Sequence, residues 1–89
     1  MKLNDEIESL NTLLSKYGEG RWKLPPVHNR SDVTRVLQMF GGMGSLNDVY
    51  ICKMNGHNIQ NSEESKVNNK IREHLENIHN GCTNFASKS

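Results

Sequence analysis

Apolar residues recur every three or four positions near the start of the chain, and this spacing constrains the fold most. The period matches the 3.6 residues per turn of an α-helix, so the apolar side chains share one face. The members of this stripe are Leu3, Ile7, Leu10, Leu14 and Tyr17. The spacing predicts a helix from about residue 4 to residue 17 that ends at Gly18. Two interpretations stay open: a helix that packs on the chain's own core, or a seam that binds a partner.

The segment "GEGRWKLPPVHNR", residues 18 to 30, is expected to be a loop because it combines glycines and prolines without periodicity. Trp22 in this loop has two interpretations. It could cover the core with its indole ring. It could instead form an exposed contact point together with Arg21, because Trp and Arg are enriched in binding hot spots.

A shorter helix is predicted to begin at Ser31 or Asp32 and to end at Gly41, because Ser is a good N-cap and apolar residues follow at helical spacing. After the glycines, "DVYICKMNGHNIQ" is rich in strand formers and carries Asn55-Gly56, the preferred pair of a two-residue β-turn. The sequence therefore predicts a β-hairpin in this region.

A third helix is predicted from Asn61 or Ser62 to Asn80, before Gly81, with a narrow apolar stripe of Val67, Ile71, Leu75 and Ile78. Residues 83–89 have no periodicity and are predicted to form a mobile tail. The expected fold class is therefore α+β. We expect one domain over residues 1–89, with the order helix, loop, helix, β-hairpin, helix.

The charges and the thiols limit the possible functions and surroundings. Eleven Lys and Arg are interleaved with ten Asp and Glu, which argues against a clustered basic face for nucleic acid. No apolar run is long enough for a signal peptide or a membrane span, so we expect a cytoplasmic protein. In a reducing compartment Cys52 and Cys82 are expected to stay free thiols.

Catalytic and metal-binding residue sets are not marked in the sequence. The candidate zinc ligands, which lack a CxxC spacing and a shared helix face, are Cys52, His57, His74, His79 and Cys82. No pair of carboxylates is placed for acid–base work, and neither cysteine lies where a thiolate is easily activated. We therefore expect no metal, no cofactor and no enzymatic activity.

The motif "FGGMGSLND", residues 40 to 48, follows a predicted helix and precedes a predicted strand. A phosphate-binding loop needs the opposite order, so the glycines are best explained as a helix cap and a tight entry into the next element. A ligand-contacting loop is the alternative interpretation. The residues of this motif loop are Gly41, Gly42, Gly44, Ser45, Asn47 and Asp48.

This motif, with "LNTLLSKYGEGRW" before it, resembles a family of small bacterial proteins of unknown function. The resemblance covers roughly residues 7 to 52, and its specific part is Phe40 to Asp48. It implies that the motif loop matters, and it brings no activity with it.

The leading interpretation is a non-enzymatic protein-binding module. Its most concrete form is a small bacterial inhibitor or immunity-type protein that neutralises a toxin or another effector. A homodimer is the other partner expected, since a core this thin leaves apolar surface over. The predicted partner-binding residues are Trp22, Arg21, Leu10 and Tyr17. The alternative is a small-ligand or enzymatic site on the loop from Gly41 to Asp48.

Overall fold

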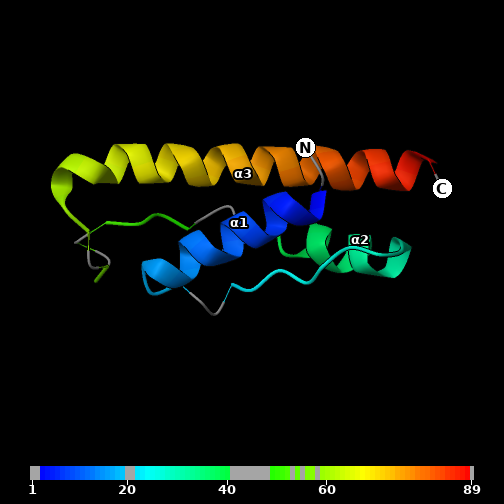
Figure 1. Cartoon of the computed structure of the whole chain (residues 1–89), viewed down its shortest axis with the longest axis horizontal. Helices are drawn as coiled ribbons and strands as arrows, with labels where there is room; N and C mark the ends of the chain where they lie inside the picture. Colours follow the sequence, from blue (N-terminus) through cyan, green and yellow to red (C-terminus); the bar gives the residue numbers. More distant parts are fainter. Residues whose placement is uncertain are drawn as a thin grey trace.

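In a computed structural model, the described part of the chain forms three helices: α1 (Leu3–Lys16), α2 (Arg30–Gln38) and α3 (Asn61–Lys88). The structure describes residues 3–19, 22–40, 49–52, 54, 56–57 and 59–88. The longest helix, α3, spans the molecule, and both shorter helices pack on it (Figure 1). The molecule measures 43 × 26 × 16 Å, and α1 and α2 both lie below α3 in the view of Figure 1.

The core lies where α1 and α2 meet α3. It combines the predicted stripes of all three helices with residues of the connecting segments. The largest fully buried side chains are Leu10, Leu14, Leu24, Ile51, Ile71, Ile78, Val36 and Cys82. The interpretation of the first stripe as a core-facing helix is thus confirmed for Leu10 and Leu14.

Helix α1 ends as predicted at Gly18. This residue has a φ of +86°, a left-handed conformation that glycine adopts without steric cost. The Gly18 N–H donates to the Ser15 carbonyl at 3.2 Å, and the Glu19 N–H donates to the Leu14 carbonyl at 2.8 Å. This pair of bonds is the Schellman motif, which satisfies carbonyls that the last helical turn leaves open.

The α+β prediction is wrong, because no β-strand is present among the described residues and the regular structure there is helical. The Ile51 N–H donates to Asn68 Oδ1, and Asn68 Nδ2 donates to the Ile51 carbonyl, both at 2.8 Å. The Cys52 N–H has its partner in the ring of His57, at 3.1 Å. Side chains therefore satisfy the N–H and C=O of Ile51 and the N–H of Cys52, which lie in the segment predicted to form a hairpin strand. Asn55, the first turn residue of the predicted hairpin, lies outside the described residues.

Two asparagines of α1 hold the loop before α2 in the same way. Asn4 accepts from the Val27 N–H at 2.7 Å and donates to the Val27 carbonyl at 3.1 Å. Asn11 accepts from the Leu24 N–H at 2.8 Å and donates to the Leu24 carbonyl at 2.9 Å. The described residues of this loop, 18–19 and 22–29, are thus non-helical, as predicted, and the loop is fixed to α1.

The spacing of these bonds follows from the geometry of the two segments. Asn4 and Asn11 are separated by about 10.5 Å along the helix axis, at 1.5 Å per residue. Leu24 and Val27 flank Pro25 and Pro26, whose rings favour a polyproline-like chain with a rise of about 9.3 Å over three residues. Prolines have no N–H, so the flanking residues are the ones that can pair fully.

The ends of α2 and α3 differ from the predicted ones. Asn29 caps α2, because its side chain accepts from the Asp32 N–H at 2.9 Å, and α2 ends at Gln38 rather than at Gly41. Helix α3 begins at Asn61 as predicted, but it continues through Gly81 to Lys88. The mobility expected of residues 83–89 stays a prediction.

Gly81 lies inside α3 and does not end it. A Cβ atom at this position would lie 2.9 Å from Leu3 Cδ1, closer than side chains normally approach. The Leu3 side chain at the start of α1 therefore lies close against the backbone of α3 at Gly81.

Candidate functional site

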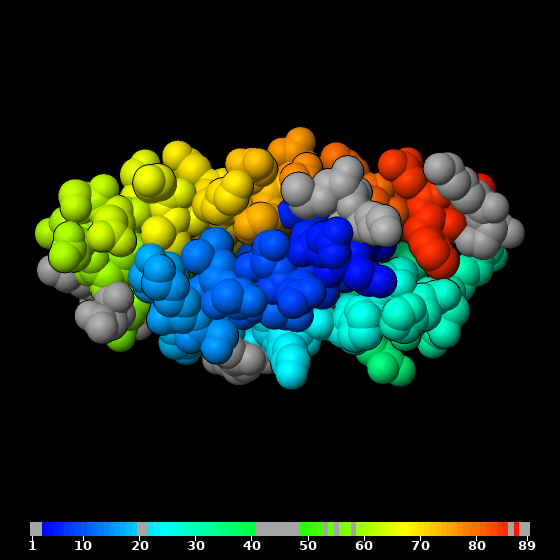
Figure 2. All heavy atoms as spheres, viewed as in Figure 1, coloured from blue at the N-terminus to red at the C-terminus, as the bar shows by residue number. Residues whose placement is uncertain are grey.

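An open groove lies between α1 and α3, on the face shown in Figure 2, where the α1 surface meets α3. It consists of two adjoining hollows that share Leu13 and Lys70. The first is lined by Asp5, Glu8, Ser9, Thr12, Leu13, Lys16, Lys70 and His74. The second is lined by Leu13, Tyr17, Glu63, Lys66, Val67, Asn69, Lys70 and Glu73. We call the two hollows together the α1/α3 groove.

The floor of the α1/α3 groove is apolar. Leu13 is half-buried and packs against the core, while Tyr17 and Val67 are buried behind it. Leu13 widens the stripe of α1 toward one side, so part of its side chain faces solvent. An apolar floor with a polar rim is the usual anatomy of a protein-binding surface.

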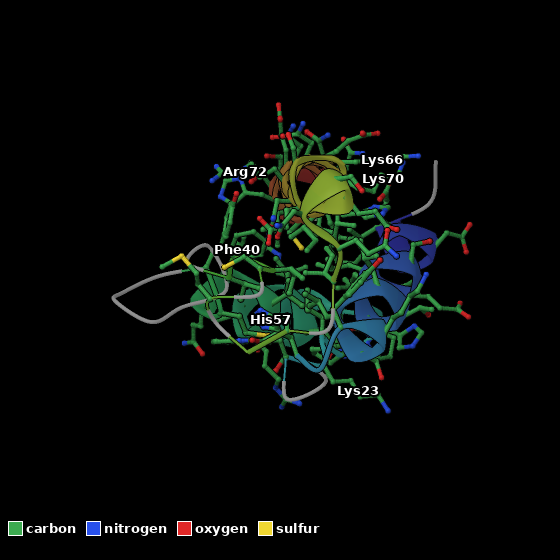
Figure 3. All side chains as sticks on the ribbon, turned by 90° about the vertical axis from the view of Figure 1, so that its left-hand side faces the viewer. Lys23, Phe40, His57, Lys66, Lys70 and Arg72 are labelled. Carbon is green, nitrogen blue, oxygen red and sulfur yellow. The ribbon has the colours of Figure 1, made fainter. Side chains whose placement is uncertain are left out.

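The charges on the rim of the groove are arranged unevenly along its length. Asp5 and Glu8 lie at the end where α1 begins, and Lys16 and Lys66 lie at the end where α1 finishes, accompanied there by Glu63. In Figure 3, Lys66 and Lys70 project from α3 toward the α1 side, whereas Arg72 projects toward the opposite side, near Phe40. The groove therefore has an acidic end and a mainly basic end.

At its centre the rim charges are neutral overall. Lys70 Nζ lies 3.8 Å from Glu73 Oε1, and both side chains are more than half exposed. Such an exposed pair contributes little stability. Lys16 Nζ lies 5.5 Å from the centre of the Tyr17 ring, a cation–π contact at the basic end.

Beneath the acidic end lies a buried polar cluster that joins α1 to α3. Glu6 Oε2 lies 2.5 Å from His74 Nδ1, and Asn77 Nδ2 donates to Glu6 Oε1 at 3.0 Å. Burial acts to raise the pKa of Glu6, but the hydrogen bonds from His74 and Asn77 outweigh it and hold that pKa below the usual value. Glu6 is therefore a carboxylate in the folded protein near neutral pH.

A second histidine–carboxylate pair joins the end of α1 to the segment before α3. His57 Nε2 lies 2.6 Å from Glu19 Oε1, while His57 Nδ1 faces the backbone of Cys52. This pair holds the non-helical segment before α3 against the end of α1. It lines neither of the two hollows of the α1/α3 groove.

The structure places the predicted partner-binding residues in different environments. Leu10 is fully buried in the core, so it offers no surface to a partner. Tyr17 is buried and lines the α1/α3 groove. Trp22 is half-buried and packs against the core. Arg21 lies outside the described residues, as does the entire motif loop with Gly41, Gly42, Gly44, Ser45, Asn47 and Asp48.

The candidate metal ligands are not brought together. Within the described part of the chain, no three His, Cys, Asp or Glu side chains are grouped so that they could hold a metal ion. Cys52 and Cys82 are free and buried. Burial raises the pKa of the Cys82 thiol, which disfavours the reactive thiolate. No described helix is both long enough and apolar enough to cross a membrane.

Sequence reasoning missed the residues that join the helices. Glu6 was not singled out as a site residue, and His74 was considered only as a metal ligand. A signal was present, because Glu6 lies three residues after Leu3 and four before Leu10, inside the apolar stripe. His74 has the same relation to Ile71 and Ile78. A polar residue at a stripe position needs a buried partner.

The fold is thus a small helical one, built on a long α3. A family model described as a domain of unknown function (DUF6966) matches residues 26–60. The match covers α2, the motif loop and the segment before α3, and it agrees with the resemblance to an uncharacterised family. No curated protein and no solved structure matches the chain.

Proposed function

We propose that this chain is a non-enzymatic protein-binding module and that the α1/α3 groove is its binding face. The observation that carries the proposal is the half-buried Leu13 between two charged helix rims. Covering apolar side chains that remain accessible between polar rims is favourable, because each Å² of apolar surface removed from water contributes about 25 cal/mol to the free energy of binding.

The most specific version of this proposal is a small bacterial inhibitor or immunity-type protein that neutralises a toxin or another effector in the cytoplasm. Small size and interleaved charges support this version by analogy with other proteins of that class. It predicts that a toxin or effector gene lies next to the gene for this chain. A neighbourhood of metabolic genes would argue against it.

The binding face is tested by affinity capture from the native host with three baits. The wild-type chain should retain a specific protein, and Leu13→Asp should lose it, because a carboxylate on the groove floor has to be desolvated on binding. Met54→Asp is the control, since Met54 is 97% exposed and lies outside the groove. Capture that is equal with all three baits would contradict the assignment of the face.

A further inference from the structure

We infer that the α1/α3 groove also pairs with the same groove of a second copy of the chain, in an antiparallel, two-fold arrangement centred on Leu13 and Lys70. This inference rests on the proposed function, because it takes the groove to be a binding face. The occupant of that face is the identical groove of a second copy, turned by 180°.

The direction of the helices makes such a pairing possible. Glu6 of α1 contacts His74 of α3, and Leu3 contacts Gly81, so α1 and α3 are antiparallel neighbours. Leu13 and Lys70 belong to both hollows and therefore mark the middle of the groove. In a two-fold interface, each residue on one side of this middle meets the residues on the other side in the partner copy.

The charges of the groove are complementary under this rotation. Glu8 lies five residues before Leu13, about 7.5 Å along α1 toward the acidic end. Lys66 lies four residues before Lys70, about 6 Å along α3 toward the basic end. A two-fold axis that runs across the groove pairs α1 with α1 and α3 with α3 of the other copy, so it brings Glu8 opposite Lys16 and Glu73 opposite Lys66 of the other copy, and each pair occurs twice.

A parallel arrangement lacks this complementarity. A parallel two-fold arrangement pairs α1 of one copy with α3 of the other, so it would place Lys16 opposite Lys66, and like charges that face each other disfavour association. The basic end includes Glu63, so the attraction there comes from Lys16 and Lys66. At the two-fold axis the Leu13 side chains meet and cover each other's apolar surface.

Sedimentation equilibrium of the full chain tests the pairing. The wild-type protein should associate reversibly to a dimer, more weakly at high salt because exposed charges are screened. Leu13→Asp should raise the dimer dissociation constant roughly tenfold or more, which corresponds to about 1.4 kcal/mol. Met54→Asp should leave it unchanged. A wild-type chain that stays monomeric at about 0.5 mM, near the weak end of specific affinities, would overturn the inference.

A charge-reversal pair makes the test independent of Leu13. One chain carries Asp5→Lys with Glu8→Lys, and the other carries Lys16→Glu with Lys66→Glu; all four positions are exposed, and circular dichroism checks that both chains fold. Each chain alone should dimerise more weakly than the wild type, and their mixture should form a heterodimer. Equal self-association of all chains, or a mixture without heterodimer, would contradict the antiparallel arrangement.

The outcomes separate the inference from the proposed function. A monomeric chain whose Leu13→Asp variant loses a captured protein contradicts the self-pairing and leaves the proposed binding face supported. A dimer that depends on Leu13, in a chain that captures nothing else, supports the self-pairing and contradicts the inhibitor version.

Discussion

In this protein, single asparagine side chains form the backbone hydrogen bonds that a neighbouring strand would form in a sheet. The carboxamide of Asn carries an acceptor and a donor side by side, so it can pair with the N–H and the C=O of one extended residue. Asn4, Asn11 and Asn68 each do this, and each fixes a non-helical segment to a helix. The connecting segments are thereby held without a sheet.

Replacing Asn11 by Ala should lower the free energy of unfolding by about 1–3 kcal/mol, because the partly buried N–H and C=O of Leu24 lose their partners. Urea denaturation measures the change. Asn84→Ala is the matched control, since Asn84 is an exposed asparagine on α3, and it should change stability by less than about 0.5 kcal/mol. Equal effects of the two substitutions would show that the paired bonds contribute nothing.

The buried carboxylate of Glu6 should make stability depend on pH in acid. Its pKa in the folded protein lies below its ordinary value of 4.5, so its contribution to stability is complete above pH 4.5 and is lost as the pH falls through the lower, folded pKa. Glu6→Gln should cost about 1.5–3 kcal/mol at neutral pH and flatten the loss of stability below pH 4.5. Urea denaturation at several pH values measures both effects.

Glu8→Gln is the control for this prediction, because Glu8 is an exposed carboxylate on the same helix. It should leave both the stability and its pH dependence close to those of the wild type. If Glu6→Gln kept the full acid dependence, the sensitive group would lie elsewhere.

At the scale of elements, α1, α2 and α3 were predictable from their apolar stripes, and the segment between α2 and α3 was not. Val49, Tyr50 and Ile51 favour strands locally, but a strand needs a neighbouring strand to pair with. Here Asn68, which lies 17 residues away from Ile51 in the sequence, takes that place. A propensity scale contains no information about such a distant side chain.

At the ends of the helices, too, a feature with a local cause was predicted from the sequence, and a feature that depends on a distant residue was not. Gly18 was correctly predicted to end α1, because its cap is formed by bonds within five residues. Gly81 was wrongly predicted to end α3, because it lies inside the helix, where the side chain of Leu3, far away in the sequence, packs against it. Glycine alone does not distinguish a cap from a close packing contact.

Gly18→Ala should destabilise the protein by about 1 kcal/mol, because an L-residue with a Cβ is strained at the φ of +86°. Gly18→Asn should cost less, since Asn tolerates the left-handed conformation better. Thermal unfolding gives the order of stability, with wild type above Asn and Asn above Ala. An Ala variant as stable as the wild type would show that position 18 does not adopt this conformation.

At the scale of the whole molecule, the described helices enclose one small core, and the surface around that core carries the features that can act on other molecules. The partner-binding residues predicted from the sequence included Leu10, which the core uses, and omitted Leu13, which lies in the α1/α3 groove. Both belong to the apolar face of α1. Which of them remains accessible depends on how α3 lies across that face, and the stripe itself does not contain this information.

Hydroxyl-radical footprinting of the chain, free and bound to the protein it captures, tests the binding face most directly. Oxidation of Leu13 should fall on binding, while oxidation of Met54, which is exposed and outside the groove, should stay the same. An unchanged rate at Leu13, together with protection of residues elsewhere on the chain, would contradict the assignment of the α1/α3 groove as the binding face.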